Sequence, residues 1–408
     1  MHTIVGVDVG TTKICTLVGE VDELGNLRIV GVGIAPSSGM RKGIVIDVRQ
    51  ATEAVVESIA KAERTSGYKI TRANIGLAGE HIASTNSNGV VAVSGQDGIT
   101  QEDIERALDS ARAVSIPHGQ EVIHIIPRGF TVDGQDGVRS PLGMHAFRLE
   151  VEAHIVTAST TALLNLSKCV EEGGVQVDEL VLNSIASGEA VLTETEKEMG
   201  VILADIGGGT TDLAIYLEGM IWHTKVLPVG GHHVTNDVAI GLRLPFNVAE
   251  KIKIERGHAR AQDIDPSSTF DLRPYGEGHS VRIARHDLAQ VIEARMDEIF
   301  SLILQEAKRS GYDGLLSAGL VLCGGAAQLP GLAALAQEVL DMPVRVAQPQ
   351  NLRGLVDLLH SPAFATSVGL LYWGTQEHAP LQPRRSNSKG LVQQLKDLFR
   401  ALFPERPE

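Results

Sequence analysis

Two stretches of the chain combine residue types that can hold a phosphate group, and they repeat one phrase. The first is 4–13, IVGVDVGTTK, and the second is 202–212, ILADIGGGTTD. In each, an apolar run ends in Asp, then Gly and Thr follow, and a second apolar run begins. A glycine turn exposes backbone N–H groups that can cradle phosphate oxygens, and threonine hydroxyls add further donors. The predicted contacts are Asp8, Gly10, Thr11, Thr12, Lys13, Asp205, Gly207, Gly208, Gly209, Thr210, Thr211 and Asp212.

The aspartates that end the two apolar runs, Asp8 and Asp205, are candidate ligands of a magnesium ion. A carboxylate at a strand end offers a hard oxygen ligand, either directly or through water. One copy of the phrase alone would be equally consistent with an ordinary hairpin whose turn an Asp stabilises. Because the phrase occurs twice, we favour the phosphate-binding interpretation.

A third glycine turn follows a buried-type apolar run at 320–331, LVLCGGAAQLPG. It leads from a predicted strand into a predicted helix, a geometry suited to close approach of the backbone to a nucleoside. Gly324, Gly325 and Ala326 are the predicted contacts.

The repeat indicates how the chain is organised around these turns. The two copies lie about half the chain apart, and each predicts a β-hairpin. A hairpin that recurs once per half indicates two like-folded domains that face each other. Helices with apolar 3.6-residue spacing are expected at 51–66 and 162–172, so strands and helices alternate and the fold class is α/β.

Two segments interrupt this pattern. The region 82–159 has a capped helix from Thr100 to Ala113 and then turn-rich strands, and is expected to be an inserted small α+β subdomain. The stretch 246–285 is polar and charged and indicates another subdomain. Residues 376–388 are rich in Pro and Ser and are expected to be a flexible linker.

Composition excludes several classes of protein. The net charge of −14 argues against a nucleic-acid partner, because phosphate backbones are bound by clustered Lys and Arg. Three widely separated cysteines without metal-ligand spacing indicate a reducing cytosolic compartment. The first residues lack the apolar stretch of a signal peptide, and no run of about 20 apolar residues occurs, so any membrane contact is expected to be peripheral.

The segment 389–404, KGLVQQLKDLFRALFP, predicts an amphipathic helix. Its apolar side chains fall within an arc of about 140° at about 100° per residue, with cations along one border of that arc. A helix docked onto its own domain is the alternative, but the linker and the flanking cations favour a lipid interface. The predicted membrane contacts are Leu391, Val392, Leu395, Lys396, Leu398, Phe399, Arg400, Leu402 and Phe403.

The three glycine turns together resemble the phosphate-1, phosphate-2 and adenosine motifs of the actin, Hsp70 and sugar-kinase superfamily. Within it, 141–157, PLGMHAFRLEVEAHIVT, resembles the inserted subdomain of the bacterial FtsA cell-division family. The resemblance implies a two-lobed actin-like (ribonuclease H-like) fold that binds ATP and Mg2+. It also implies this division: lobe 1A at 1–81, 160–192 and 349–375, subdomain 1C at 82–159, lobe 2A at 193–230 and 301–348, and subdomain 2B at 231–300.

The resemblance also assigns further residues. A crossover phrase that begins at Gly230 and Gly231 implies nucleotide contacts from these glycines and from Glu250 and Lys253. Subdomain 2B would receive the C-terminal peptide of the tubulin-like protein FtsZ; the residues placed there are Arg282, Arg285, Arg295 and Glu298. A surface salt-bridge pair on an ordinary helix is the alternative for Arg295 and Glu298.

Hydrolysing members of the superfamily carry a water-positioning Glu where this chain has Ser184, so slow ATP hydrolysis at most is expected. Glu189 could substitute if the loop register differs. The implied function is a tether that self-associates, holds FtsZ filaments on the cytoplasmic face of the inner membrane at the division septum, and recruits later division proteins through 1C. The alternatives are an actin-like component of type IV pilus assembly and a small-molecule kinase of the same superfamily.

Overall fold

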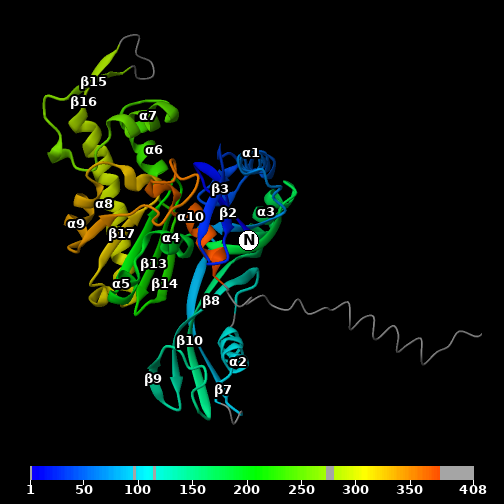
Figure 1. Cartoon of the computed structure of the whole chain (residues 1–408). Coiled ribbons are helices and arrows are strands. Elements are labelled where there is room, and N and C mark those ends of the chain that lie inside the picture. The colour runs from blue at the N-terminus through cyan, green and yellow to red at the C-terminus, as the bar shows by residue number, and fades with distance from the viewer. Residues whose placement is uncertain (1, 95–97, 114–115, 273–279, 377–408) are drawn as a thin grey trace, which may run out of the picture. The chain divides into compact units, whose positions relative to one another are not determined.

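The computed structural model describes residues 2–94, 98–113, 116–272 and 280–376. Its first five-stranded sheet has the order β11-β6-β1-β2-β3, and Figure 1 labels β2 and β3 of this sheet. In it β1, β2 and β3 form an antiparallel meander, and β6 and β11 add in parallel to β1. The strands are β1 (His2–Val9), β2 (Lys13–Val21), β3 (Leu27–Pro36), β6 (Arg72–Leu77) and β11 (Gln176–Leu182).

The second five-stranded sheet repeats this topology in the order β14-β13-β12-β17-β18. Its first three strands are again antiparallel, and the last two add in parallel. The strands are β12 (Val201–Ile206), β13 (Thr211–Leu217), β14 (Met220–Leu227), β17 (Gly319–Cys323) and β18 (Val344–Val346). The prediction of two like-folded halves, each starting with a hairpin, is therefore confirmed.

Helices pack against these sheets or against one another. On the first half they are α1 (Val48–Ser66), α3 (Thr160–Glu171), α4 (Asn183–Val191) and α10 (Ala365–Thr375). On the second they are α6 (Gly231–Gly241), α7 (Phe246–Arg256), α8 (Arg285–Ser310) and α9 (Leu332–Leu340). The helix predicted at 51–66 begins three residues earlier, because the Asp47 side chain caps it by accepting from the Gln50 N–H. It ends at Gly67 in the left-handed conformation.

Helices α4 and α10 cross each other between the two halves (Figure 1). At the crossing, a Cβ on Gly369 of α10 would lie 1.8 Å from the Ala186 carbonyl oxygen of α4. Only glycine permits this approach. The close packing brings polar side chains of both helices to the ends of β1 and β12.

A third sheet, in the order β7-β10-β8-β9, lies between β6 and α3 in the sequence. It is formed by β7 (Ala83–Ala92), β8 (Gln120–Val132), β9 (Gln135–Val138) and β10 (Arg148–Ser159), with α2 (Gln101–Arg112) packed on one face. Thr100 and Asp103 form a capping box at the start of α2, as the sequence predicted. Because this sheet and α2 have a hydrophobic core of their own, they form an inserted α+β unit.

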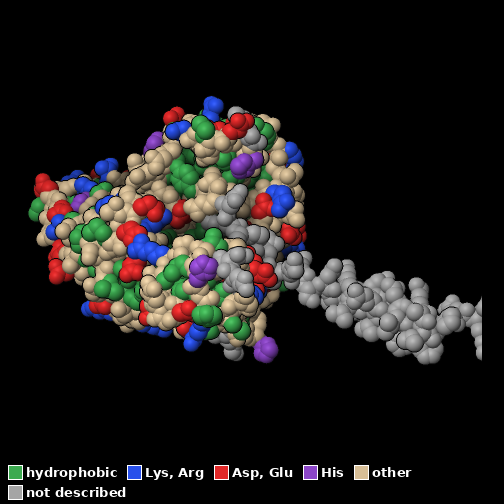
Figure 2. Space-filling model, turned by 60° about the horizontal axis from the view of Figure 1, so that its bottom comes forward, with side chains coloured by type: hydrophobic (Ala, Val, Ile, Leu, Met, Phe, Trp, Pro, Cys, Tyr) green, Lys and Arg blue, Asp and Glu red, His purple; other side chains and the backbone are tan. Residues whose placement is uncertain are grey.

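Short elements complete the described chain. They are β4 (Met40–Arg41), β5 (Ile44–Val45), α5 (Glu194–Met199), β15 (Thr269–Leu272), β16 (Val281–Ala284) and four 3-10 turns at Ala261–Asp263, Asp313–Leu315, Gly325–Gln328 and Pro362–Phe364. Cys15, Cys169 and Cys323 are buried free thiols. On the face that Figure 2 shows, basic and acidic side chains are interspersed.

The predicted amphipathic helix at 389–404 and all but the first residue of the predicted linker at 376–388 lie outside the described residues. Among the helices that are described, none has the length and apolar character needed to span a bilayer.

A buried cation joins the third sheet to the second half. Arg128 of β8 has 3% of its surface exposed, and its guanidinium lies 4.3 Å from the centre of the Trp222 ring on β14. Its Nη2 donates to the Tyr312 hydroxyl at 2.5 Å, and its Nη1 to Glu152 Oε1 at 2.7 Å. A second arginine, Arg139, also spans the two parts, but its bidentate pair with Glu198 is exposed.

Arg128 should contribute more than Arg139 to the free energy of unfolding. We predict that Arg128→Ala lowers the free energy of unfolding by about 2 kcal/mol, because it removes a buried cation–π contact and the packing of the Arg128 side chain against the second half. The matched change Arg139→Ala should cost less than about 1 kcal/mol, since exposed ion pairs contribute little. Denaturant melts of both variants test this, and equal losses would contradict the prediction that Arg128 contributes more than Arg139.

Candidate nucleotide-binding site

The two hairpin turns predicted to bind phosphate lie against each other. In the first, Asp8 pairs with Cys15 across β1 and β2, and in the second Asp205 pairs with Asp212 across β12 and β13. A Cβ on Gly208 would lie 2.2 Å from the Thr12 Oγ1 of the other turn. The turns can approach this closely because glycine occupies this position.

The two strand-end carboxylates are buried and held by hydroxyl groups of the crossing helices. The Ser367 hydroxyl of α10 donates to Asp8 Oδ2 at 2.9 Å. The hydroxyls of Ser187 on α4 and Thr366 on α10 donate to Asp205 Oδ2 at 2.5 and 2.9 Å. Burial raises the pKa of Asp8 to about 6, although Lys13 and the Ser367 hydrogen bond oppose this rise, and burial also raises the pKa of Asp205. Both carboxylates are therefore costly to ionise without a further cation.

A third carboxylate lies beside them. Asp212 is buried; its Oδ2 accepts from the Thr210 hydroxyl at 3.0 Å, and its Oδ1 has no hydrogen-bond partner among the described residues. Burial, and then the charge of Asp205, raise its pKa well above the ordinary value. The ammonium of Lys13 donates to the Ala363 carbonyl and lies 3.7 Å from the centre of the Phe364 ring.

These groups line one cleft with a volume of about 360 Å³. It contains almost all of the nucleotide contacts predicted from the sequence. Those that line it are Asp8, Gly10, Thr11, Thr12, Lys13, Asp205, Gly207, Gly208, Gly209, Thr210, Asp212, Gly231, Glu250, Lys253, Gly324, Gly325 and Ala326. Turns from both halves thus face a single cavity.

Helix α7 is tied to α6 at one side of the cleft by the predicted pair Glu250 and Lys253. The Lys253 ammonium donates to Glu250 Oε2 at 2.8 Å, to the Thr235 hydroxyl at 2.8 Å and to the Gly231 carbonyl at 3.1 Å. Burial would raise the pKa of Glu250, but the hydrogen bonds from Lys253 and Thr235 outweigh it and the pKa is lowered. Glu250 is thus held ionised beside the cleft.

Two of the predicted contacts, Thr211 and Gly230, are not part of the cleft lining. Thr211 is fully buried and donates its hydroxyl to the Val229 carbonyl at 2.9 Å. Gly230 is buried, and its N–H donates to Nδ1 of His233 at 3.1 Å. Both residues shape the backbone beside the cleft.

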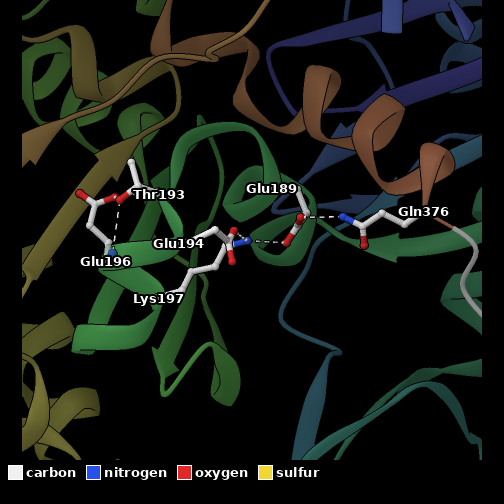
Figure 3. A network of polar contacts seen from close by, with 6 residues as sticks. All are labelled: Glu189, Thr193, Glu194, Glu196, Lys197 and Gln376. Atoms are coloured by element: carbon white, nitrogen blue, oxygen red, sulfur yellow. Dashed lines mark hydrogen bonds and ion pairs between the residues drawn. The ribbon is translucent and has the colours of Figure 1, made fainter. Parts of the chain in front are cut away.

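Ser184, the position where hydrolysing relatives carry a water-positioning Glu, does not face the cleft. Asn183 lines the cleft, with a buried Oδ1 that has no partner among the described residues. Its neighbour Ser184 is buried and is not part of the cleft lining. Glu189 lies elsewhere on α4, where its two oxygens contact the ammonium of Lys197 at 3.1 Å and the Gln376 amide at 2.8 Å (Figure 3). Glu189 therefore does not substitute as a catalytic carboxylate.

Several residues that line the cleft were not predicted from the sequence. They are Val9, Gly43, Ala78, Asn183, His232, Val234, Ile254, Met296, Gln328, Leu329, Pro330, Ala363 and Thr366. Most come from helices and loops that carry no phosphate-binding phrase. Val9 and 328–330 lie within the glycine-turn phrases quoted above, and His232 directly follows the predicted glycine pair Gly230 and Gly231.

The four residues predicted to meet a partner peptide are not joined in one cluster. Arg295 of α8 binds Asp237 of α6 through two hydrogen bonds, of 2.5 and 3.1 Å, and also pairs with Glu298. The alternative of a structural salt bridge therefore fits Arg295 better. Arg282 of β16 is exposed and makes one long contact, of 3.4 Å, with Asp271, while the Arg285 Nε donates to the Arg256 carbonyl at 2.8 Å.

Family comparisons agree with this architecture. The model of the family described as cell division protein FtsA matches residues 202–369, and that of the SHS2 domain inserted in FtsA matches residues 79–157. The chain is 44% identical to the FtsA of Pseudomonas aeruginosa over 92% of this chain and 90% of that protein. It is 38% identical to the FtsA of Escherichia coli K12 over 92% of this chain and 91% of that protein.

Solved structures share the fold at low sequence identity. A PilM-PilN type IV pilus biogenesis complex matches with a TM-score of 0.66 and 16% identity, over 91% of this chain and 98% of that chain. MreB 5 of Spiroplasma citri bound to AMPPNP matches with a TM-score of 0.54 and 13% identity, over 97% of this chain and 99% of that chain. The fold is therefore actin-like, with two related lobes and one inserted subdomain.

The similarity to the curated relatives extends over both halves and the inserted sheet, at an identity far above that of the fold-level neighbours. The chain therefore belongs to the FtsA family of actin-like cell-division proteins.

Proposed function

We propose that the cleft binds ATP with its phosphates between the two hairpin turns. The observation that carries this proposal is that glycine-threonine turns from both halves line one cavity. Turns of this kind can bind phosphate oxygens through backbone N–H groups and hydroxyls. The adenosine would contact Glu250, Lys253 and the turn Gly324–Ala326. The MreB 5 structure of the same fold has AMPPNP bound, which supports the assignment.

We propose that a magnesium ion binds in the cleft beside Asp8 and Asp205. Within the described residues, no group of three or more Asp, Glu, His or Cys side chains is arranged to hold a metal. Magnesium in nucleotide sites is held by one or two carboxylates together with waters and phosphates. Asp8 and Asp205 are the proposed carboxylates, and the unpartnered Oδ1 of Asp212 could accept from a bound water. The ion would neutralise charges that burial disfavours.

Hydrolysis in this cleft should be slow. Ser184 stands where hydrolysing relatives of the superfamily carry a Glu, and Asn183, its neighbour in the cleft lining, has an amide that cannot take a proton. We therefore propose that the nucleotide mainly sets the conformation and the self-association of the protein.

The proposed cellular role is that of a tether. ATP-bound protomers would polymerise, the segment 389–404 would insert into the cytoplasmic leaflet of the inner membrane at the septum, and the body would hold FtsZ filaments. Later division proteins would bind the inserted sheet. A pilus-assembly role has only a fold-level likeness in its favour, and a small-molecule kinase would need a catalytic base beside the terminal phosphate.

For this role we propose that the chain is divided into four subdomains. Lobe 1A would comprise 1–81, 160–192 and 349–375, and 1C would comprise 82–159. Lobe 2A would comprise 193–230 and 301–348, and 2B would comprise 231–300. We place the FtsZ peptide on 2B beside Arg282 and Arg285, because Arg295 is already held by Asp237.

The first prediction concerns the carboxylates. Asp205→Ala should weaken binding of magnesium-ATP by about tenfold or more, because it removes a proposed metal ligand. Asp237→Ala is the control, since it removes a carboxylate of similar chemistry that only pairs with Arg295. Calorimetric titration measures both, and equal losses would contradict the proposed site.

The second prediction concerns the peptide. Arg282→Glu should lower the affinity for an acidic C-terminal peptide of FtsZ by about fivefold to tenfold, and the loss should shrink as salt rises. Lys251→Glu on α7, another exposed cation, is the control. An unchanged affinity for Arg282→Glu, measured by fluorescence anisotropy, would remove Arg282 from the site.

The third prediction concerns the membrane. Phe399→Asp in the full chain should abolish sedimentation with anionic liposomes, because it places a carboxylate on the predicted immersed face. Gln393→Asp adds the same charge to the opposite face and should reduce binding only slightly. If instead Phe399→Asp lowers the melting temperature of the protein and leaves liposome binding intact, the helix docks on the body.

A further inference from the structure

One side chain contacts both phosphate turns. His232 is the second residue of α6, and its backbone N–H donates to the Gly208 carbonyl of the second turn at 2.8 Å. Its ring Nε2 lies 3.3 Å from the Thr12 Oγ1 of the first turn. Because the two turns belong to different halves of the fold, His232 links the halves, through its backbone on one side and its imidazole on the other.

The environment fixes this ring and keeps it neutral. Phe246 at the start of α7 packs edge-on against it, with ring centres 5.5 Å apart. Burial lowers the pKa of His232; the charge of Glu250 opposes this, and Lys253 and His233 add to it. A neutral imidazole carries one N–H, so the ring can present a single directed donor to the cleft.

The neighbouring His233 has a different role. Its Nδ1 accepts from the Gly230 N–H at 3.1 Å, so it fixes the backbone at the start of α6. His233 is absent from the cleft lining, whereas His232 is part of it. His232 therefore faces the cleft, whereas His233 stabilises the start of α6.

We propose that His232 determines specificity for a nucleoside triphosphate over a diphosphate. A phosphate chain that starts at the turn Gly324–Ala326 and runs between the two hairpins ends where Thr12 and Gly208 meet. The terminal phosphate would take the place of Thr12 as the partner of the imidazole N–H. With a diphosphate the ring would keep its contact with Thr12, so it would add nothing to the affinity. This inference rests on the proposed nucleotide function.

A site built to hydrogen-bond one group discriminates against the ligand that lacks it. A hydrogen bond to a charged phosphate oxygen corresponds to about tenfold or more in affinity. Removal of the ring should therefore reduce affinity for the triphosphate and leave affinity for the diphosphate nearly unchanged.

The test is calorimetric titration of the full chain with magnesium-AMPPNP and, separately, magnesium-ADP. His232→Ala should lose about tenfold in affinity for AMPPNP and stay within about twofold for ADP, whereas His232→Gln, which retains an N–H donor, should keep most of both. His286→Ala on α8, whose ring pairs with Asp287 away from the cleft lining, is the control and should match the wild type.

Two results would overturn the inference while the nucleotide site stands. Equal losses for both nucleotides in His232→Ala would assign the ring a purely structural role, and no loss for either would remove it from the site. A wild-type chain that binds neither nucleotide would remove the proposed function itself, and the inference with it. Melting curves without nucleotide establish that each variant is folded.

Discussion

The burial of Asp8, Asp205 and Asp212 between the two halves is the constraint on which the rest of the structure depends. Burial raises the pKa of all three carboxyl groups, so the fold must supply partners for them. For Asp8 and Asp205 it does so by crossing α4 and α10 at Gly369, which brings Ser187, Thr366 and Ser367 to the strand ends. Asp212 accepts from Thr210 of its own turn, and its Oδ1 has no partner among the described residues. The same crossing joins the two lobes at the floor of the cleft.

This arrangement also connects the cleft with the end of the described chain. Helix α4 carries Ser187 at the carboxylates and, two residues later, Glu189, which binds the Gln376 amide. Gln376 directly follows α10 and precedes the segment proposed to reach the membrane. The two helices that hold the carboxylates are therefore joined again at Gln376, the last residue that the structure describes.

The sequence predicted those parts of the fold and site that local chemistry specifies. The hairpins, their glycine turns and the capping box of α2 depend on neighbouring residues, and they were predicted correctly. Thr211 is not part of the cleft lining, because successive side chains of a strand point to opposite faces and the cleft lies on the face of Asp212. The roles of His232 and Arg295 depend on Thr12 and Asp237, which are remote in sequence and could not be paired without the fold.

The most direct test of the account is the melting temperature of the full chain with ATP in the presence of magnesium and, separately, with ATP and EDTA. If the buried carboxylates bind magnesium together with ATP, magnesium-ATP should raise the melting temperature by several degrees. ATP with EDTA should raise it much less. An equal rise under both conditions, or no rise with magnesium-ATP, would contradict the central claim.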